Sequence, residues 1–131
     1  MDQQAAGEMT QGAGRAPQSS LVAEAQRLTA FFSAHGAANE AKGSLTDEAL
    51  AALRDGGLLA LWIPKCFGGV EAGPIEGLEV IEALSYADGS TGWVLMAAQV
   101  AMASAAAYLH PKAATEVFGT RMPIIAGQGA A

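Results

Sequence analysis

The sequence has few basic residues and a single cysteine, and each shortage excludes a class of function. Seven Lys and Arg residues stand against 13 Asp and Glu residues, which leaves a net charge of −6. Nucleic-acid binding needs clustered cations to neutralise phosphates, so no nucleic-acid partner is expected. The one cysteine, Cys66, excludes an internal disulfide and fits the reducing cytoplasm, which is the expected location.

Long hydrophobic runs are also missing. The best candidate, residues 93–109, carries no charge but is short, rich in Ala and interrupted by Gln99 and Ser104. A membrane-spanning helix needs about 20 predominantly apolar residues, and Ala contributes little to insertion. Residues 1–20 are rich in Gln, Gly and Ala and lack the apolar core of a secretory signal. We therefore expect a soluble protein without a membrane partner.

The composition is that of one packed domain with a polar tail. Hydrophobic residues make up 51% of the chain and charged residues 15%, which is sufficient for a substantial core. Residues 1–18 contain Gly and Pro and little to bury, so they are predicted to form a disordered tail. Residues 19–121 repeat apolar positions at helical spacing. The predicted fold class is all-α, a helical bundle over this range.

The first predicted helix begins at a cap formed by Ser19 or Ser20 and ends near Gly36, before a polar connection over residues 37–43. Its apolar stripe contains Leu21, Ala25, Leu28 and Phe32. The spacing of this stripe is that of one face of an α-helix.

The second predicted helix is capped by Thr46 and stopped by the pair Gly56-Gly57. The negative charges of Asp47 and Glu48 fall in its first turn, where the helix dipole favours them. The apolar run over residues 58–63 follows. It fits a short strand or a buried extended segment, and we interpret it as a buried connector.

The third predicted helix begins at Pro74, whose missing N–H is not needed at the first helical position. Its apolar residues recur every three positions and are assigned to one face: Ile75, Leu78, Ile81 and Leu84. The fourth predicted helix is capped by Ser90 or Thr91 and extends to about Leu109. A short helix from Pro111 follows.

The helical pattern ends at Pro123, and residues 124–127 form a short β-prone apolar run. A lone strand has no partner for its backbone groups. Residues 122–131 are therefore interpreted as the beginning of a β-domain. On this interpretation the chain is a truncated, N-terminal piece of a longer protein.

No constellation of side chains predicts a catalytic residue or a metal site. The glutamates of the third predicted helix have no accompanying His and are interpreted as a solvated face. Cys66 has Lys65 beside it, but no motif connects it with His35 or His110. The glycines of Phe67-Gly68-Gly69 lack the spacing of a phosphate loop and fit a tight turn of positive φ.

One face of the fourth predicted helix mixes large and small side chains: Trp93, Met96, Ala97, Val100 and Ser104. Most such faces belong to a plain core. Small residues beside a Trp also leave room for a ligand, so a ligand-binding wall is the second interpretation.

The order of the motifs carries a family resemblance. Residues 49–59, then Trp62-Ile63-Pro64, Phe67-Gly68-Gly69 and residues 78–82, resemble the N-terminal helical domain of the acyl-CoA dehydrogenase superfamily. Residues 87–94, Ala-Asp-Gly-Ser-Thr-Gly-Trp-Val, are most similar to its monooxygenase branch, the flavin-dependent hydroxylases of the hydroxyphenylacetate type.

The resemblance covers about residues 21–131 and implies a complete subunit of three parts: an N-terminal helical domain, a central β-domain and a C-terminal four-helix bundle. Flavin, either FAD or FMN, binds mainly between the last two parts in such a subunit, so this chain is not expected to retain it. The implied partners are a small-molecule substrate, either acyl-CoA or an aromatic compound, further copies in a homo-tetramer, and a flavin reductase.

By the same resemblance, the fourth helix supplies one wall of the substrate cavity. The implied substrate-binding residues are Trp93, Val94, Ala97 and Val100, and the implied cofactor-binding residues are Ser90 and Thr91 near the flavin edge. The monooxygenases often carry a His about two turns after the Trp, where this chain has Gln99, Val100 and Ala101. Hydroxylase and dehydrogenase chemistry both stay open. A small helical protein-interaction module without catalytic activity is the alternative from another class.

Overall fold

A computed structural model describes residues 19–127, and within them the chain is helical, as predicted for residues 19–121. The α-helices are α1 (Ser20–Arg27), α2 (Thr29–Lys42), α3 (Asp47–Asp55), α4 (Pro74–Ala87), α5 (Gly89–Tyr108) and α6 (Pro111–Phe118). Two single 3₁₀ turns, η1 (Leu58–Ala60) and η2 (Lys65–Phe67), lie between α3 and α4. The predicted disordered tail, residues 1–18, lies outside the described residues.

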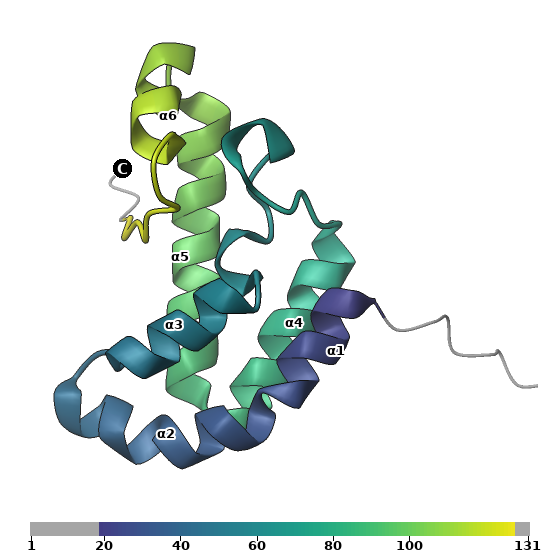
Figure 1. Ribbon diagram of the computed structural model, residues 1–131, viewed down its shortest axis with the longest axis vertical. Coiled ribbons are helices and arrows are strands. Elements are labelled where there is room, and N and C mark those ends of the chain that lie inside the picture. Colours follow the sequence, from purple (N-terminus) through teal and green to yellow (C-terminus); the bar gives the residue numbers. More distant parts are fainter. Residues whose placement is uncertain (1–18, 128–131) are drawn as a thin grey trace, which may run out of the picture.

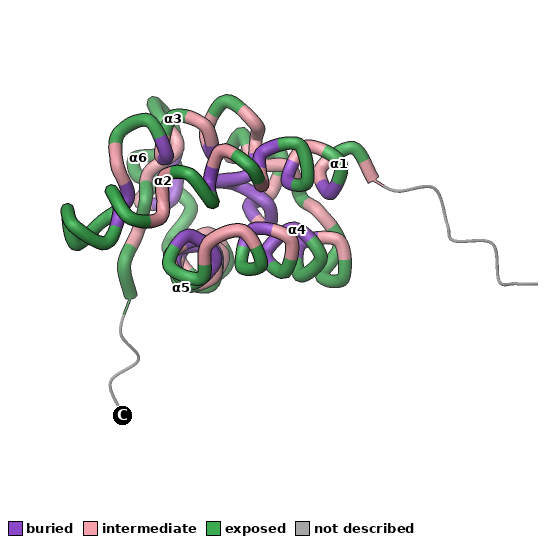
Figure 2. Tube along the Cα trace, turned by 90° about the horizontal axis from the view of Figure 1, so that it is seen from below, coloured by how far each residue is buried: buried purple, intermediate pink, exposed green. Residues whose placement is uncertain are grey.

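The helices form two layers. α4 and α5 meet at a sharp corner and diverge from it, and α6 packs at the far end of α5 (Figure 1). Seen from below, α4 and α5 lie in one layer and α1, α2 and α3 lie in the other, with buried residues where the layers meet (Figure 2). The opposite side of the α4–α5 layer carries exposed residues. Within residues 19–127, no helix has the length and hydropathy that a membrane crossing requires.

Several helix ends follow the predicted chemistry. The Ser19 side chain caps α1 by accepting a hydrogen bond from the Val22 N–H at 3.1 Å. Thr46 caps α3 by accepting from the Ala49 N–H at 3.2 Å. Pro74 is the first residue of α4, where its missing N–H leaves no donor unpaired. These ends were predictable because each cap depends on a few consecutive residues.

The N-terminal helical segment differs from the prediction at Gly36. The chain bends at Leu28, and α2 then continues through Gly36 to Lys42, where Gly43 adopts a left-handed conformation with φ +71°. A Cβ at position 36 would lie 3.3 Å from the Asp88 Oδ1 atom. Gly36 therefore does not end the helix. It permits close packing of α2 on the junction between α4 and α5.

The apolar face of α4 also differs from the prediction. The residues that it buries are Gly77, Val80, Ile81 and Leu84, which follow the i, i+3, i+4, i+7 spacing of a helix face. Ile75 and Leu78 are 69% and 52% exposed. A strict three-residue repeat drifts by about 60° per step on a helix of 3.6 residues per turn, so its early members rotate out of the core.

The connector over residues 58–63 is buried, as predicted, but it contains the 3₁₀ turn η1 instead of an extended segment. Backbone hydrogen bonds tie it to the loop before α4. The N–H groups of Val70 and Ala72 donate to the carbonyl oxygens of Ala60 and Leu61 at 2.9 and 2.7 Å. Leu58, Leu59 and Leu61 join the larger hydrophobic core.

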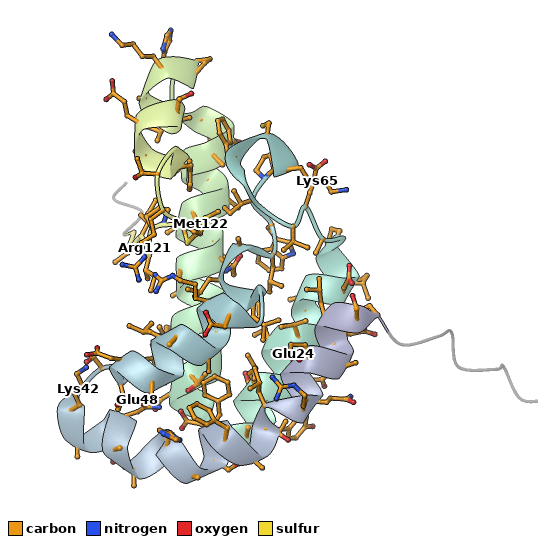
Figure 3. The ribbon with its side chains drawn as sticks, in the orientation of Figure 1. Glu24, Lys42, Glu48, Lys65, Arg121 and Met122 are labelled. Atoms are coloured by element: carbon orange, nitrogen blue, oxygen red, sulfur yellow. The ribbon has the colours of Figure 1, made fainter. Side chains whose placement is uncertain are left out.

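The segment after α6 is irregular throughout residues 122–127, so the predicted strand at 124–127 is absent from the described residues. A strand needs a partner for its backbone groups, and the described part of the chain offers none. Met122 lies beside α5 (Figure 3). Met122 and Ile125 pack on a second small core that includes Met102 and Phe118.

Candidate functional site: a groove along α5

The site is positioned by the corner between α4 and α5. Asp88 caps α5, so the prediction of Ser90 or Thr91 as the cap is wrong. The Asp88 Oδ2 atom accepts hydrogen bonds from the Thr91 N–H at 3.0 Å and from the Thr91 hydroxyl at 2.6 Å. Several candidates for a cap stand close together in the sequence, and the carboxylate takes the position because it satisfies both Thr91 donors.

The corner is fastened to α2. The Ser33 hydroxyl donates to the Ala87 carbonyl oxygen at 2.9 Å, and Gly36 leaves space for the Asp88 carboxylate. Partial burial alone raises the pKa of Asp88. Hydrogen bonds from the Thr91 hydroxyl and N–H, with a smaller contribution from the Ser90 N–H, outweigh this effect and hold the pKa below its ordinary value.

We expect Asp88→Ala to lower the free energy of unfolding by about 1–2 kcal/mol at neutral pH, because α5 loses its cap. Asp88→Asn keeps an acceptor and should cost less. Since folding lowers the pKa of Asp88, the ionised carboxylate stabilises the fold above its ordinary pKa of 3.8, and this contribution is lost as the pH falls below that value. Urea unfolding at pH 7 and pH 3 measures the difference in free energy of unfolding between the wild-type protein and Asp88→Asn. We expect this difference to be smaller at pH 3. An equal difference at both pH values would contradict this account.

Gly92 brings α4 and α5 into close contact. A Cβ at this position would lie 2.0 Å from the Ser85 Oγ atom and 2.7 Å from the Ser85 Cα atom. Gly92 is buried against α4, and the next residue, Trp93, is therefore directed to the outer face of α5, where it is 66% exposed. The motif over residues 87–94 is in this way a structural corner that presents a tryptophan.

Trp93 stands at one end of a groove between α5 and the segment after α6. The groove has a volume of about 560 Å³. Its lining consists of small or apolar residues and one serine: Trp93, Met96, Ala97, Val100, Ala101, Ser104, Ile125 and Gly127. A Cβ on Gly127 would lie 3.1 Å from the Ala101 Cβ, so the C-terminal segment approaches the helix closely there. We call this site the α5 groove.

A second hollow lies on the other side of the same tryptophan. It has a volume of about 450 Å³ and is lined by the end of α2, the α2–α3 turn and the first turns of α5: Asn39, Glu40, Gly43, Ser44, Leu45, Gly89, Ser90, Trp93 and Val94. We call it the α2–α5 hollow. The indole of Trp93 is thus part of the lining of both spaces.

The predicted substrate-binding residues divide between these two spaces. Trp93, Ala97 and Val100 line the α5 groove, and Val94 lines the α2–α5 hollow together with the predicted cofactor contact Ser90. Thr91 lines neither. It is completely buried, and its hydroxyl donates to Asp88.

Gln99 is the residue whose position sequence reasoning did not anticipate. It is completely buried on the inner face of α5. Its Nε2 atom donates to the Leu59 carbonyl oxygen at 2.6 Å, and its Oε1 atom accepts from the Trp62 N–H at 3.4 Å. Gln99 therefore joins α5 to the buried connector. Of the three positions where the monooxygenases often carry a His, only Val100 and Ala101 face the groove.

The Phe67-Gly68-Gly69 motif has a structural role at the other end of the connector. Gly68 has a φ of +80°, as predicted for a tight turn, and a Cβ on Gly69 would collide with the Ile63 carbonyl. The Phe67 ring stacks on the Phe118 ring of α6 with centroids 5.6 Å apart. The loop therefore holds α6 through this ring contact.

The α5 groove can bind an uncharged apolar group, but its described lining residues include no ionisable side chain for proton transfer. Cys66 is exposed in η2 and is not among the lining residues. His35 contacts the Phe31 carbonyl oxygen, and His110 caps α6. Within residues 19–127, no group of three or more His, Cys, Asp or Glu side chains is placed to hold a metal ion.

Comparison with known proteins identifies this helical unit. The family described as "Acyl-CoA dehydrogenase, N-terminal domain" matches residues 16–115, most of the chain. The chain belongs to this family. The helices from α1 to the first half of α6 lie inside the matched range, and so does the corner that presents Trp93.

Two relatives of this family member are monooxygenases. The chain is 40% identical over 50 residues to the indole-3-acetate monooxygenase of Pseudomonas putida, a match that spans 38% of this chain and 13% of that protein. Its fold is similar to that of the HsaA monooxygenase from M. tuberculosis, with a TM-score of 0.72 and 31% sequence identity. This match covers 77% of this chain and 28% of the HsaA chain. The chain therefore spans a small part of the proteins that it resembles.

Proposed function

We propose that the chain is the N-terminal helical part of a flavin-dependent oxidoreductase, and that the outer face of α5 is one wall of its substrate pocket. The observation that carries this proposal is the α5 groove. A soluble fold normally buries its tryptophans, yet Trp93 is 66% exposed beside small residues that leave a space open. Two monooxygenase relatives and the uncharged lining favour a hydroxylase with an aromatic substrate over a dehydrogenase of acyl-CoA.

The described residues do not fit a binding site for the phosphate groups of FAD or FMN. Where α5 begins, the Asp88 carboxylate occupies the helix N-terminus that an anion would need. No Lys or Arg of residues 19–127 lines either space beside Trp93, and the α2–α5 hollow includes the acidic Glu40. We propose that the flavin is held chiefly by other parts of the complete protein, with Ser90 as the remaining contact from this chain.

The assembly of the complete protein follows as a further part of the proposal. We propose that the complete protein forms a homo-tetramer and, as a hydroxylase, receives reduced flavin from a separate reductase. The apolar residues exposed on the outer face of α4 and α5, among them Ile75, Leu78 and Val100, fit a surface that other domains or subunits cover.

Indole is a suitable probe of the proposed pocket because it is aromatic, uncharged and part of the compound named for the Pseudomonas relative. We expect a titration of the isotope-labelled chain with indole to shift the backbone amide signals of α5 between Trp93 and Ser104. The amides of α1, which lies in the other layer, should not move. Shifts spread evenly over the molecule, or none at all, would contradict the proposal and leave the interaction module as the better account.

A further inference from the structure

Among residues 19–127, the lining of the α5 groove contains one hydroxyl side chain, Ser104. Ser104 follows Ala97 by two helical turns and Ala101 by about one, so these residues share the face that borders the groove. When a ring packs on the small side chains of Ala97 and Ala101, its end over Ala101 therefore lies about 5 Å, roughly one turn of helix, from the serine along the axis. The described residues that line the groove next to Ser104, Val100 and Ala101, offer such a ring only apolar contact through their side chains. The other polar group in this lining, the indole N–H of Trp93, lies about three helical turns away.

The hydrogen of the Ser104 hydroxyl is already used. Its Oγ atom donates to the Val100 carbonyl oxygen at 2.8 Å, and a carbonyl has no hydrogen to give in return. The oxygen keeps its own lone pairs, and the residue is exposed to the groove. Toward a ligand, Ser104 is consequently an acceptor and not a donor.

We propose that Ser104 is a specificity-determining residue that selects ligands carrying an N–H or O–H donor at this end of the ring. The inference rests on the proposed function, because it concerns the same groove. An anionic substituent is disfavoured here, since Ser104 offers it no hydrogen and none of the described lining residues is a cation. The preferred ligand is an uncharged aromatic ring with a donor, such as an indole N–H or a phenol O–H, directed at Ser104.

The test compares indole with 1-methylindole, in which a methyl group replaces the donor hydrogen. Because the methyl group also changes the apolar area, the quantity measured is the ratio of the two dissociation constants. One neutral hydrogen bond corresponds to a factor of about three to ten, so Ser104→Ala should reduce the preference for indole by this factor. Thr115→Ala is the matched control, because Thr115 makes the same type of bond to the Pro111 carbonyl oxygen outside the groove.

The outcomes separate this inference from the proposed function. If both ligands shift the groove amides and Ser104→Ala leaves their ratio unchanged, Ser104 does not determine specificity, while the groove remains a ligand site. If neither ligand shifts those amides, the proposed function fails. Ala forms helices better than Ser, and position 104 is exposed, so the variant should remain folded.

Discussion

Gln99→Met is expected to lower the free energy of unfolding by about 2–4 kcal/mol, although methionine matches glutamine in length and is more apolar. The substitution leaves the Leu59 carbonyl oxygen and the Trp62 N–H without their partners inside the protein. Each buried backbone group left unpaired costs about 1–3 kcal/mol. The hydrophobic gain from the thioether is smaller, because the glutamine methylenes are already buried. Urea unfolding of both proteins measures the difference.

Gln26→Met is the matched control for this prediction. It makes the same chemical change on α1, where the residue is exposed, and should alter the free energy of unfolding by less than about 0.5 kcal/mol. Equal losses for the two variants would mean that the Gln99 amide does not join α5 to the connector. In that case the rotation of α5, and with it the direction of Trp93, would depend on packing alone.

Gly92→Ala should lower the free energy of unfolding by about 1–3 kcal/mol, even though alanine is the better helix former. The added methyl group meets the Ser85 Cα atom at 2.7 Å, and backbone cannot move aside as a side chain can. α4 and α5 must separate to accommodate it. Thermal or denaturant unfolding measures the loss. The double variant with Ser85→Ala should recover only part of it, because the clash with the backbone of residue 85 persists.

Gly89→Ala is the control, since it adds the same methyl group to the same helix with nothing within 4 Å. We expect it to leave stability unchanged or to raise it by up to about 1 kcal/mol. If Gly92→Ala is as stable as Gly89→Ala, the close approach of α4 to α5 is not required, and another packing of the two helices is equally stable.

The parts of the fold that could be predicted from the sequence depend on local chemistry. Ser19 and Thr46 cap their helices through the next three residues, and Pro74 begins α4 for a reason contained in its own ring. The position of Trp93 was also predictable, because Gly92 and Ala97 beside it are too small to enclose an indole. Its exposure agrees with this interpretation.

The parts that could not be predicted depend on contacts distant in sequence. Gly36 signals the end of a helix when it is considered locally, but its partner is Asp88, on another helix junction. Gln99 lies in an uncharged run, and only the fold places the connector against it. The contact between the Ser33 hydroxyl and the Ala87 carbonyl oxygen, which fastens the corner to α2, likewise joins residues far apart in the sequence. The substrate-binding roles of Trp93, Val94, Ala97 and Val100 and the cofactor-binding roles of Ser90 and Thr91 stay predictions.

The account rests on Trp93 as part of a ligand wall, and one pair of variants tests this most directly. Trp93→Ala and Tyr108→Ala each remove an exposed aromatic ring from α5, and Tyr108, 89% exposed, lines neither space beside Trp93. Each variant is unfolded in denaturant and titrated with indole. We expect both to lose less than about 1 kcal/mol in stability, and only Trp93→Ala to lose indole binding. A loss of about 3–5 kcal/mol for Trp93→Ala, the range of a core aromatic, or unchanged indole binding, would contradict the account.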